Sequence, residues 1–156
     1  MAKPKIEHYC AYQERCHSEV KNKLFELGLY PNEVDALIAE MIVTGFLNEE
    51  RFAKAYAGGK FRTKHWGRIK IRQELKFRKL TDYCIKKGMA EISDSDYEKT
   101  LSMLIEKKMR EVRGGTLRTR QQKVLKYLMS KGYETENILK ALKAAEQEPE
   151  VIQNDI

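Results

Sequence analysis

Two blocks of lysine and arginine carry the most distinctive chemistry in this chain. Residues 60–80 hold nine basic side chains against one acidic one, and residues 107–131 hold the same numbers. The remaining segments are net acidic, although the whole chain has a net charge of +7. Acidic partners at helical spacing are nearly absent from both blocks, so these cations repel one another. A surface that only keeps a protein in solution would mix its charges, and this segregation therefore favours binding to a polyanion.

The cations of each block fall into a row at helical spacing. In the first row, Arg68, Arg72, Lys76 and Lys79 recur every three or four residues, which places them on one face of a helix. In the second row, Arg120, Lys123 and either Lys126 or Lys131 flank the apolar positions of a later helix. We expect both rows to lie on equivalent, solvated faces and to follow one phosphate backbone. Replacing either row by alanine should then change the free energy of unfolding by less than about 1 kcal/mol. The candidate nucleic-acid contacts are Lys64, Arg68, Lys70, Arg72, Lys76, Lys79, Arg118, Arg120, Lys123 and Lys126.

Aromatic side chains are interleaved with these cations. Phe61, Trp66 and Tyr127 could stack on bases, as aromatic platforms of nucleic-acid-binding proteins do. Alternatively, Trp66 packs at the junction between neighbouring modules with its ring edge in water. The packing interpretation is the one we favour.

The sequence contains no pattern typical of catalysis or metal binding. His8, Cys10, Cys16 and His17 match no zinc-ligand spacing, and the acidic residues do not gather into a candidate nuclease cluster. Phosphate-binding loops, dinucleotide-binding glycine motifs and nucleophile elbows are absent. We therefore expect a protein that is not an enzyme and needs no cofactor or metal. Three irregularly spaced cysteines, no secretory leader and no long apolar run predict a cytoplasmic protein with no membrane contact.

The chain repeats itself three times. Residues 20–40, 71–91 and 124–144 align without gaps and superimpose Leu24, Leu75 and Leu128. Each copy has the pattern of two helices joined by a turn. Gly28 and Gly132 occupy the turn, where a helix end favours the left-handed conformation, and Lys79 takes that place in the middle copy.

A third helix is predicted after each of the first two pairs. Asn48 is a suitable N-cap for one, and Asp94 or Ser95 for the other. The register there shifts by six residues, which predicts a shorter second helix in the middle copy. In the third copy, Thr135 and Asn137 offer caps to the second helix, and the polar tail with Glu148, Pro149 and Glu150 is too short for another helix.

These patterns predict an all-α fold of eight or nine helices. The modules are too small to bury much surface alone, so we expect three tandem helix-turn-helix-like repeats stacked into an elongated, gently curved body. The predicted boundaries are 1–66, 67–115 and 116–156, with Gly114 and Gly115 as a flexible link.

Two segments have distinctive motifs: residues 47–53 (LNEERFA) with Tyr56, and residues 64–75 (KHWGRIKIRQEL). They resemble the signature of the RecX family, regulators of the RecA recombinase, and the likeness extends over roughly residues 10–145. The chain departs from the pattern at Asn48, where an aspartate is usual, and at Lys79, where a glycine is usual.

The resemblance implies a fold of three repeats with three helices each. It also implies a monomer that binds the RecA–DNA filament in its groove and restrains filament growth, ATP hydrolysis and strand exchange during DNA recombination, repair and the SOS response. Its partners would be the RecA nucleoprotein filament and single- or double-stranded DNA. The alternative is a helix-turn-helix transcription regulator. The second helices, at 31–41, 81–90 and 135–145, carry few side chains suited to reading bases, which disfavours this alternative.

Overall fold

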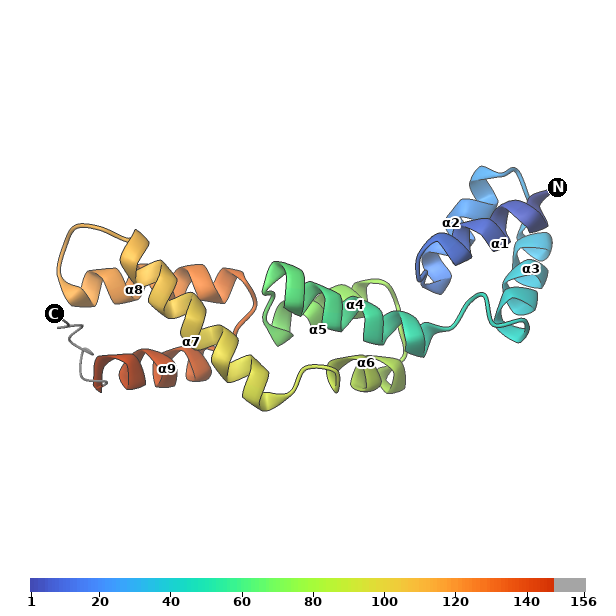
Figure 1. Ribbon diagram of the computed structural model, residues 1–156. Helices are drawn as coiled ribbons and strands as arrows, with labels where there is room; N and C mark the ends of the chain where they lie inside the picture. Colours follow the sequence, from blue (N-terminus) through green and yellow to red (C-terminus); the bar gives the residue numbers. More distant parts are fainter. Residues whose placement is uncertain (148–156) are drawn as a thin grey trace, which may run out of the picture. The chain divides into compact units, whose positions relative to one another are not determined.

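The computed structural model describes residues 1–147, and within this range the chain forms helices and no strands (Figure 1). The helices are α1 (Ala2–Tyr12), α2 (His17–Glu26), α3 (Pro31–Val43), α4 (Glu49–Lys64), α5 (Arg68–Phe77), α6 (Asp82–Met89), α7 (Asp94–Glu111), α8 (Leu117–Ser130) and α9 (Thr135–Gln147). The predicted all-α class is confirmed. Eight of the nine described helices fall within the three predicted copies. The remaining helix, α1, lies before the first copy at the start of the chain. The prediction for Glu148, Pro149 and Glu150 lies outside the described residues.

The first helices of the three copies end in the same way. The residue at each turn has a left-handed backbone, with φ of +90° at Gly28, +64° at Lys79 and +98° at Gly132. The next N–H then donates to a carbonyl five residues back, which satisfies a helix end that would otherwise lack a partner. These bonds are Leu29 to Leu24 (3.3 Å), Leu80 to Leu75 (3.3 Å) and Tyr133 to Leu128 (3.1 Å). The three aligned leucines therefore occupy one structural place, as the repeat predicts.

Lys79 carries backbone strain that its glycine counterparts avoid. A side chain in the left-handed region costs about 1 kcal/mol, so Lys79→Gly should raise the free energy of unfolding by about that amount. Gly28→Ala is the converse control. No atom lies within 4 Å of the Cβ it would add, so it should destabilise by a similar amount through the backbone alone. Urea unfolding followed by circular dichroism measures both changes. A Lys79→Gly midpoint at or below that of the native protein would contradict the prediction.

The helix caps agree with the sequence at one helix and differ at two. Asn48 Oδ1 accepts a hydrogen bond from Arg51 N (2.9 Å), which confirms Asn48 as the cap of α4. The predicted cap of α7 is wrong, because Ser93 Oγ accepts from Asp96 N (3.1 Å) and the helix already begins at Asp94. The prediction for α9 is also wrong. Since α9 begins at Thr135, both suggested residues lie inside its first turn. The shorter second helix of the middle copy is confirmed: α6 has 8 residues, and α3 has 13.

The chain divides into two compact units. The first contains residues 1–59 and 72–91, and the second contains residues 60–71 and the described residues from Ile92 onward. Helices α4 and α5 each pass from one unit into the other, so the middle repeat contributes to both. The core of the first unit includes Ile6, Val20, Leu24, Val34, Met41 and Leu47. In the second unit α7, α8 and α9 contact one another and bury Leu101, Ile105, Val124, Leu128 and Ile138. The predicted repeat boundaries at 66/67 and 115/116 stay a prediction.

The second unit contains a joint in which the start of α5 meets the end of α8. Gly67 N–H donates to Lys131 O (2.7 Å), and Ile69 N–H donates to Gly132 O (3.0 Å). A Cβ on Gly67 would overlap the backbone of Gly132, so the two chain segments touch directly. N–H groups at the start of α5 thus donate to carbonyls at the end of α8, and both kinds of group would otherwise lack a partner. The positive end of one helix dipole also faces the negative end of the other, which is favourable. This joint fixes where α5 begins.

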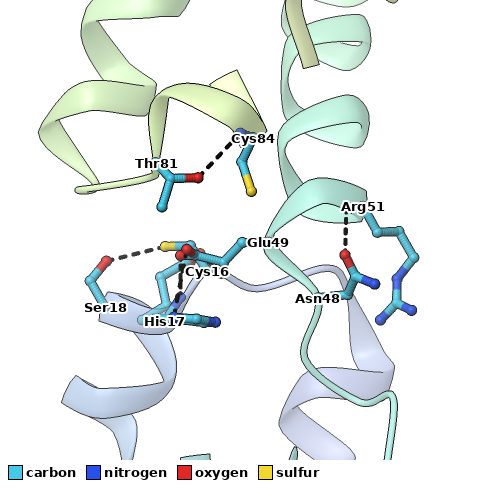
Figure 2. A network of polar contacts seen from close by, with 9 residues as sticks. Cys16, His17, Ser18, Asn48, Glu49, Arg51, Thr81 and Cys84 are labelled. Carbon is cyan, nitrogen blue, oxygen red and sulfur yellow. Dashed lines mark hydrogen bonds and ion pairs between the residues drawn. The ribbon is translucent and has the colours of Figure 1, made fainter. Parts of the chain in front are cut away.

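The first unit ties helix starts together through side chains. His17 N–H donates to Glu49 Oε2 (3.1 Å), which links the start of α2 to the start of α4 (Figure 2). The repeat register aligns these two residues with Arg68 and Asp94, and that pair also bonds, at 2.8 Å in the second unit. In the first two copies the first helix is therefore anchored to the third helix at matching positions. Glu49 belongs to the LNEERFA segment, so this motif acts here as a packing element.

Candidate nucleic-acid interface

The ten candidate cations divide into two groups by exposure. Those in the first group point into solvent, and none of them forms an ion pair with a described residue. Those in the second group are half-buried. The exposed group is Lys64, Arg72, Lys76, Lys79, Arg118, Lys123 and Lys126, and the half-buried group is Arg68, Lys70 and Arg120.

Arg68 is engaged by the protein itself. Its Nη2 donates to Ile92 O (3.0 Å) and to Asp94 Oδ1 (2.8 Å), and its guanidinium lies 4.2 Å from the centroid of the Tyr97 ring. The buried Tyr97 hydroxyl accepts from Arg68 N (3.0 Å) and donates to Glu134 Oε1 (2.6 Å). Burial and the hydrogen bond to Glu134 raise the pKa of Tyr97 well above its ordinary value, so the phenol stays a neutral donor. The Arg68 side chain therefore joins α5 to the start of α7.

Arg120 has an equally structural role. Its Nε donates to Val112 O (3.1 Å) and its Nη2 donates to Met109 O (2.7 Å), which satisfies carbonyls at the end of α7. Hydrogen bonds from a charged donor typically contribute about 1.5–3 kcal/mol. The expectation that both rows are freely solvated is therefore wrong at Arg68 and Arg120, and replacing either residue should destabilise the fold.

The exposed cations of α5 and α8 do not all sit on equivalent faces. In the repeat register Arg72 and Lys76 align with Leu125 and Met129, and Lys126 aligns with Gln73. Lys123 and Lys126 therefore lie on a different side of α8 from the side that Arg72 and Lys76 take on α5, contrary to the sequence-based expectation, whereas Arg118 lies on the matching side. We call Arg72, Lys76 and Lys79, which lies in the turn directly after the helix, the α5 cations, and Arg118, Lys123 and Lys126 the α8 cations.

The three aromatic candidates are covered to different degrees. Phe61 is buried, with its ring centroid 5.9 Å from that of Tyr97. Trp66 is half-buried, and the amines of Lys60 and Lys70 lie 5.0 and 4.4 Å from its ring centroid. Tyr127 is also half-buried, with the Lys108 amine 4.2 Å from its ring centroid. These contacts support the packing interpretation.

The exposed aromatic side chain of the first basic block is Phe77, which the sequence reasoning missed. It is 83% exposed at the last position of α5. The signal was available, because Phe77 lies off the apolar stripe formed by Ile71 and Leu75. A phenylalanine on the polar side of an amphipathic helix has no packing role to fill.

Cys10 and Cys16 are buried, and within residues 1–147 no three histidine, cysteine or acidic side chains are placed to hold a metal ion. None of the nine described helices has the length and apolar character needed to cross a bilayer.

Comparisons with known proteins agree on one family. The model of the second three-helix domain of RecX matches residues 48–89, and the model of the third three-helix domain matches residues 96–142. The first range contains α4–α6, and the second contains α8 and most of α7 and α9; together they span more than half of the chain. The helices are thus grouped with the longest one first in each domain.

Curated relatives and solved structures extend the likeness. The regulatory protein RecX of Geobacillus kaustophilus is 25% identical over 135 residues, which are 86% of this chain and 50% of that protein. The regulatory protein RecX of Limosilactobacillus reuteri is 26% identical over 125 residues, which are 80% of this chain and 47% of that protein. The chain spans about half the length of these curated relatives.

Two crystal structures share the fold. RecX from Lactobacillus salivarius superimposes with a TM-score of 0.83 at 21% identity, covering 92% of this chain and 94% of that one. A second structure of a regulatory protein RecX superimposes with a TM-score of 0.82 at 22% identity, covering 91% of this chain and 70% of that one. With both three-helix domain models matched in order along a chain of this fold, the protein belongs to the RecX family.

Proposed function

We propose that this chain regulates a RecA-type recombinase by binding the RecA–DNA filament in its groove. It limits filament extension, ATP hydrolysis and strand exchange, and it acts as a cytoplasmic monomer through binding and not through catalysis. Membership of the RecX family, whose curated relatives are named regulatory proteins, supports this proposal. DNA phosphates are the second partner, contacted by the exposed cations of α5 and α8.

The observation that carries the DNA contact is the group of exposed cations without acidic partners. Like charges on one helix face repel one another and gain nothing from folding, whereas DNA phosphates would neutralise them. Arg68 and Arg120 are left out of this set, since their hydrogen bonds to the protein occupy their guanidinium groups.

Co-sedimentation with RecA filaments assembled on single-stranded DNA tests the proposal. We expect the protein to pellet with the filaments and to slow their ATP hydrolysis. Naked DNA of random and of defined sequence serves as the comparison. A protein that ignores the filament and prefers one duplex sequence would instead be the helix-turn-helix transcription regulator considered above, and the proposal would fail.

Binding to DNA should be nearly independent of sequence and should weaken steeply with salt. Each neutralised phosphate contributes about −0.9 to the slope of log K against log salt on duplex DNA, because condensed counterions are released. About six to eight engaged cations, the candidates that remain without Arg68 and Arg120, predict a slope of about −5 to −7. Fluorescence anisotropy over a salt series measures it. A slope near zero would contradict phosphate binding.

A further inference from the structure

We propose that Phe77, Gln73 and the neighbouring α5 cations Arg72 and Lys76 form a docking site for single-stranded nucleic acid, with one base stacked on the Phe77 ring. This inference rests on the proposed binding to DNA and adds the kind of strand that the α5 face takes.

The exposure of Phe77 is the first observation. Its side chain is 83% exposed, whereas Phe61 is buried and Trp66 is half-buried within the same basic block. Apart from Ile69, which is 39% exposed, the other exposed side chains of α5 are polar or charged, and the benzyl ring of Phe77 among them offers a stacking surface. Phe77 is also the last residue of α5, so no further turn of this helix follows it.

The arrangement along α5 is the second observation. At about 100° per residue, Gln73 and Phe77 share one stripe of the helix, and Arg72 and Lys76 share the neighbouring stripe. All four side chains are exposed. One stripe therefore presents a ring and an amide, and the other presents two cations about 6 Å apart along the axis. Glu74, the one carboxylate of the helix, is half-buried on the other flank of Phe77.

These two stripes match the chemistry of an unpaired strand. Phosphates along the backbone would contact Arg72 and Lys76, and a base turned to the side would stack on Phe77. The Gln73 amide both donates and accepts, so it can bond the edge of any base. In a duplex the faces of the bases are covered by their neighbours, so the ring finds no open base to stack on unless the helix is kinked.

The surroundings of Phe77 favour a nucleic acid over a protein partner. The core of a protein–protein interface is depleted of charged residues, whereas Phe77 is flanked by Lys76 and, one turn earlier, by Gln73 and Arg72. Cations interleaved with an aromatic ring are typical of grooves that follow a single strand.

The test compares single- and double-stranded probes on Phe77 variants of the full chain. The probes are a fluorescein-labelled oligothymidylate and a mixed-sequence duplex of the same length. Phe77→Leu keeps an apolar side chain without a π face, and Phe77→Trp keeps the face. Val43→Ala is the matched control, since Val43 is 86% exposed on α3, outside both basic blocks. Circular dichroism checks that each variant is folded.

We expect Phe77→Leu to weaken binding to oligothymidylate by about 5- to 150-fold, the range measured for one base–aromatic stack. Binding to the duplex should change less than about twofold, and the salt slope should stay that of the native protein, since no phosphate contact is lost. Phe77→Trp should restore binding, with the added tryptophan emission quenched by the probe, and Val43→Ala should change neither probe.

Three outcomes would overturn the inference. In the first, Phe77→Leu binds oligothymidylate like the native protein, which leaves the proposed DNA binding intact and removes only the stacking site. In the second, Phe77→Leu weakens both probes equally, which assigns Phe77 to a general contact. In the third, the native protein binds neither probe, which removes the proposed DNA binding and this inference with it.

Discussion

Replacing Gly132 by alanine is expected to destabilise the second compact unit by roughly 2–5 kcal/mol. Gly132 combines a left-handed backbone, φ +98°, with direct contact to α5, where its added Cβ would lie 2.6 Å from Lys70 N. The backbone conformation alone costs an L-residue about 1–2 kcal/mol, and overpacking a contact that cannot relax typically adds about 1–3 kcal/mol. Retreat of α5 would also stretch the hydrogen bond from Ile69 N–H to Gly132 O.

Two features of the chain make this experiment selective. Trp66 is the one tryptophan of the chain and lies in the second unit, so its fluorescence reports the unfolding of that unit. Gly28→Ala supplies the matched control in the first unit, measured by circular dichroism, because Gly28 has φ +90° and open space around its Cβ. The difference between the two variants isolates the close approach of the two chain segments. Equal losses for Gly28→Ala and Gly132→Ala would show that the joint contributes no steric constraint.

The positions of the helices could be predicted from local patterns in the sequence. Leu24, Leu75 and Leu128 mark the repeat, and the residue four places later takes the left-handed conformation even where it is Lys79. Backbone requirements of a helix end are local, so aligned copies reveal them. Caps were harder to place. Ser93, Asp94 and Ser95 can all accept a hydrogen bond, and which one precedes the first turn depends on where the chain leaves α6.

The roles of individual cations were less predictable than the positions of the helices. Spacing places Arg68 in one row with Arg72 and Lys76, yet Arg68 bonds to Ile92 O and Asp94, residues far away in the sequence. Arg120 is likewise bound to carbonyls of α7. Helical periodicity shows which residues share a face of a helix, but not what that face contacts. An arginine can donate hydrogen bonds to a carbonyl oxygen or to a phosphate equally well.

The two segments that carry the family resemblance prove to be largely structural. In the first, Glu49 anchors α2, and Ala53 packs against Gly88 so closely that a Cβ there would meet its backbone. In the second, Gly67 and Arg68 build the joints of α5. Side chains available to a partner, such as Phe77 and the α8 cations, lie outside these fixed contacts. The second segment also contains the exposed Lys64, Arg72 and Gln73, so the motifs hold both packing residues and candidate contacts.

Neutralising either set of exposed cations is expected to weaken DNA binding by about 100-fold or more at about 0.1 M salt. The loss of three phosphate contacts reduces the magnitude of the slope of log K against log salt by about 2–3. The first variant changes Arg72 and Lys76 to alanine and Lys79 to asparagine, which is neutral and tolerates the left-handed conformation. The second variant changes Arg118, Lys123 and Lys126 to alanine. Arg68 and Arg120 are retained because their hydrogen bonds support the fold.

A third variant with the same loss of charge separates a specific face from the net charge of the protein. Lys99, Lys140 and Lys143 are exposed on α7 and α9, outside both basic blocks, and their replacement by alanine also removes three positive charges. The free energy of unfolding of all three variants should stay within about 1 kcal/mol of that of the native protein, because exposed lysines and arginines contribute little to folding and alanine favours helices.

Anisotropy titrations with DNA and the rate of ATP hydrolysis by RecA filaments measure the effect of each variant on binding and on inhibition. If the cations of α5 and α8 hold phosphates within the filament, binding and inhibition weaken together in the first two variants and stay near native in the third. Equal losses in all three would assign the effect to net charge. Inhibition that survives the loss of DNA binding would place the regulatory contact on RecA itself. The acidic segments outside the basic blocks would then be the surfaces to change, because the first two variants leave them untouched.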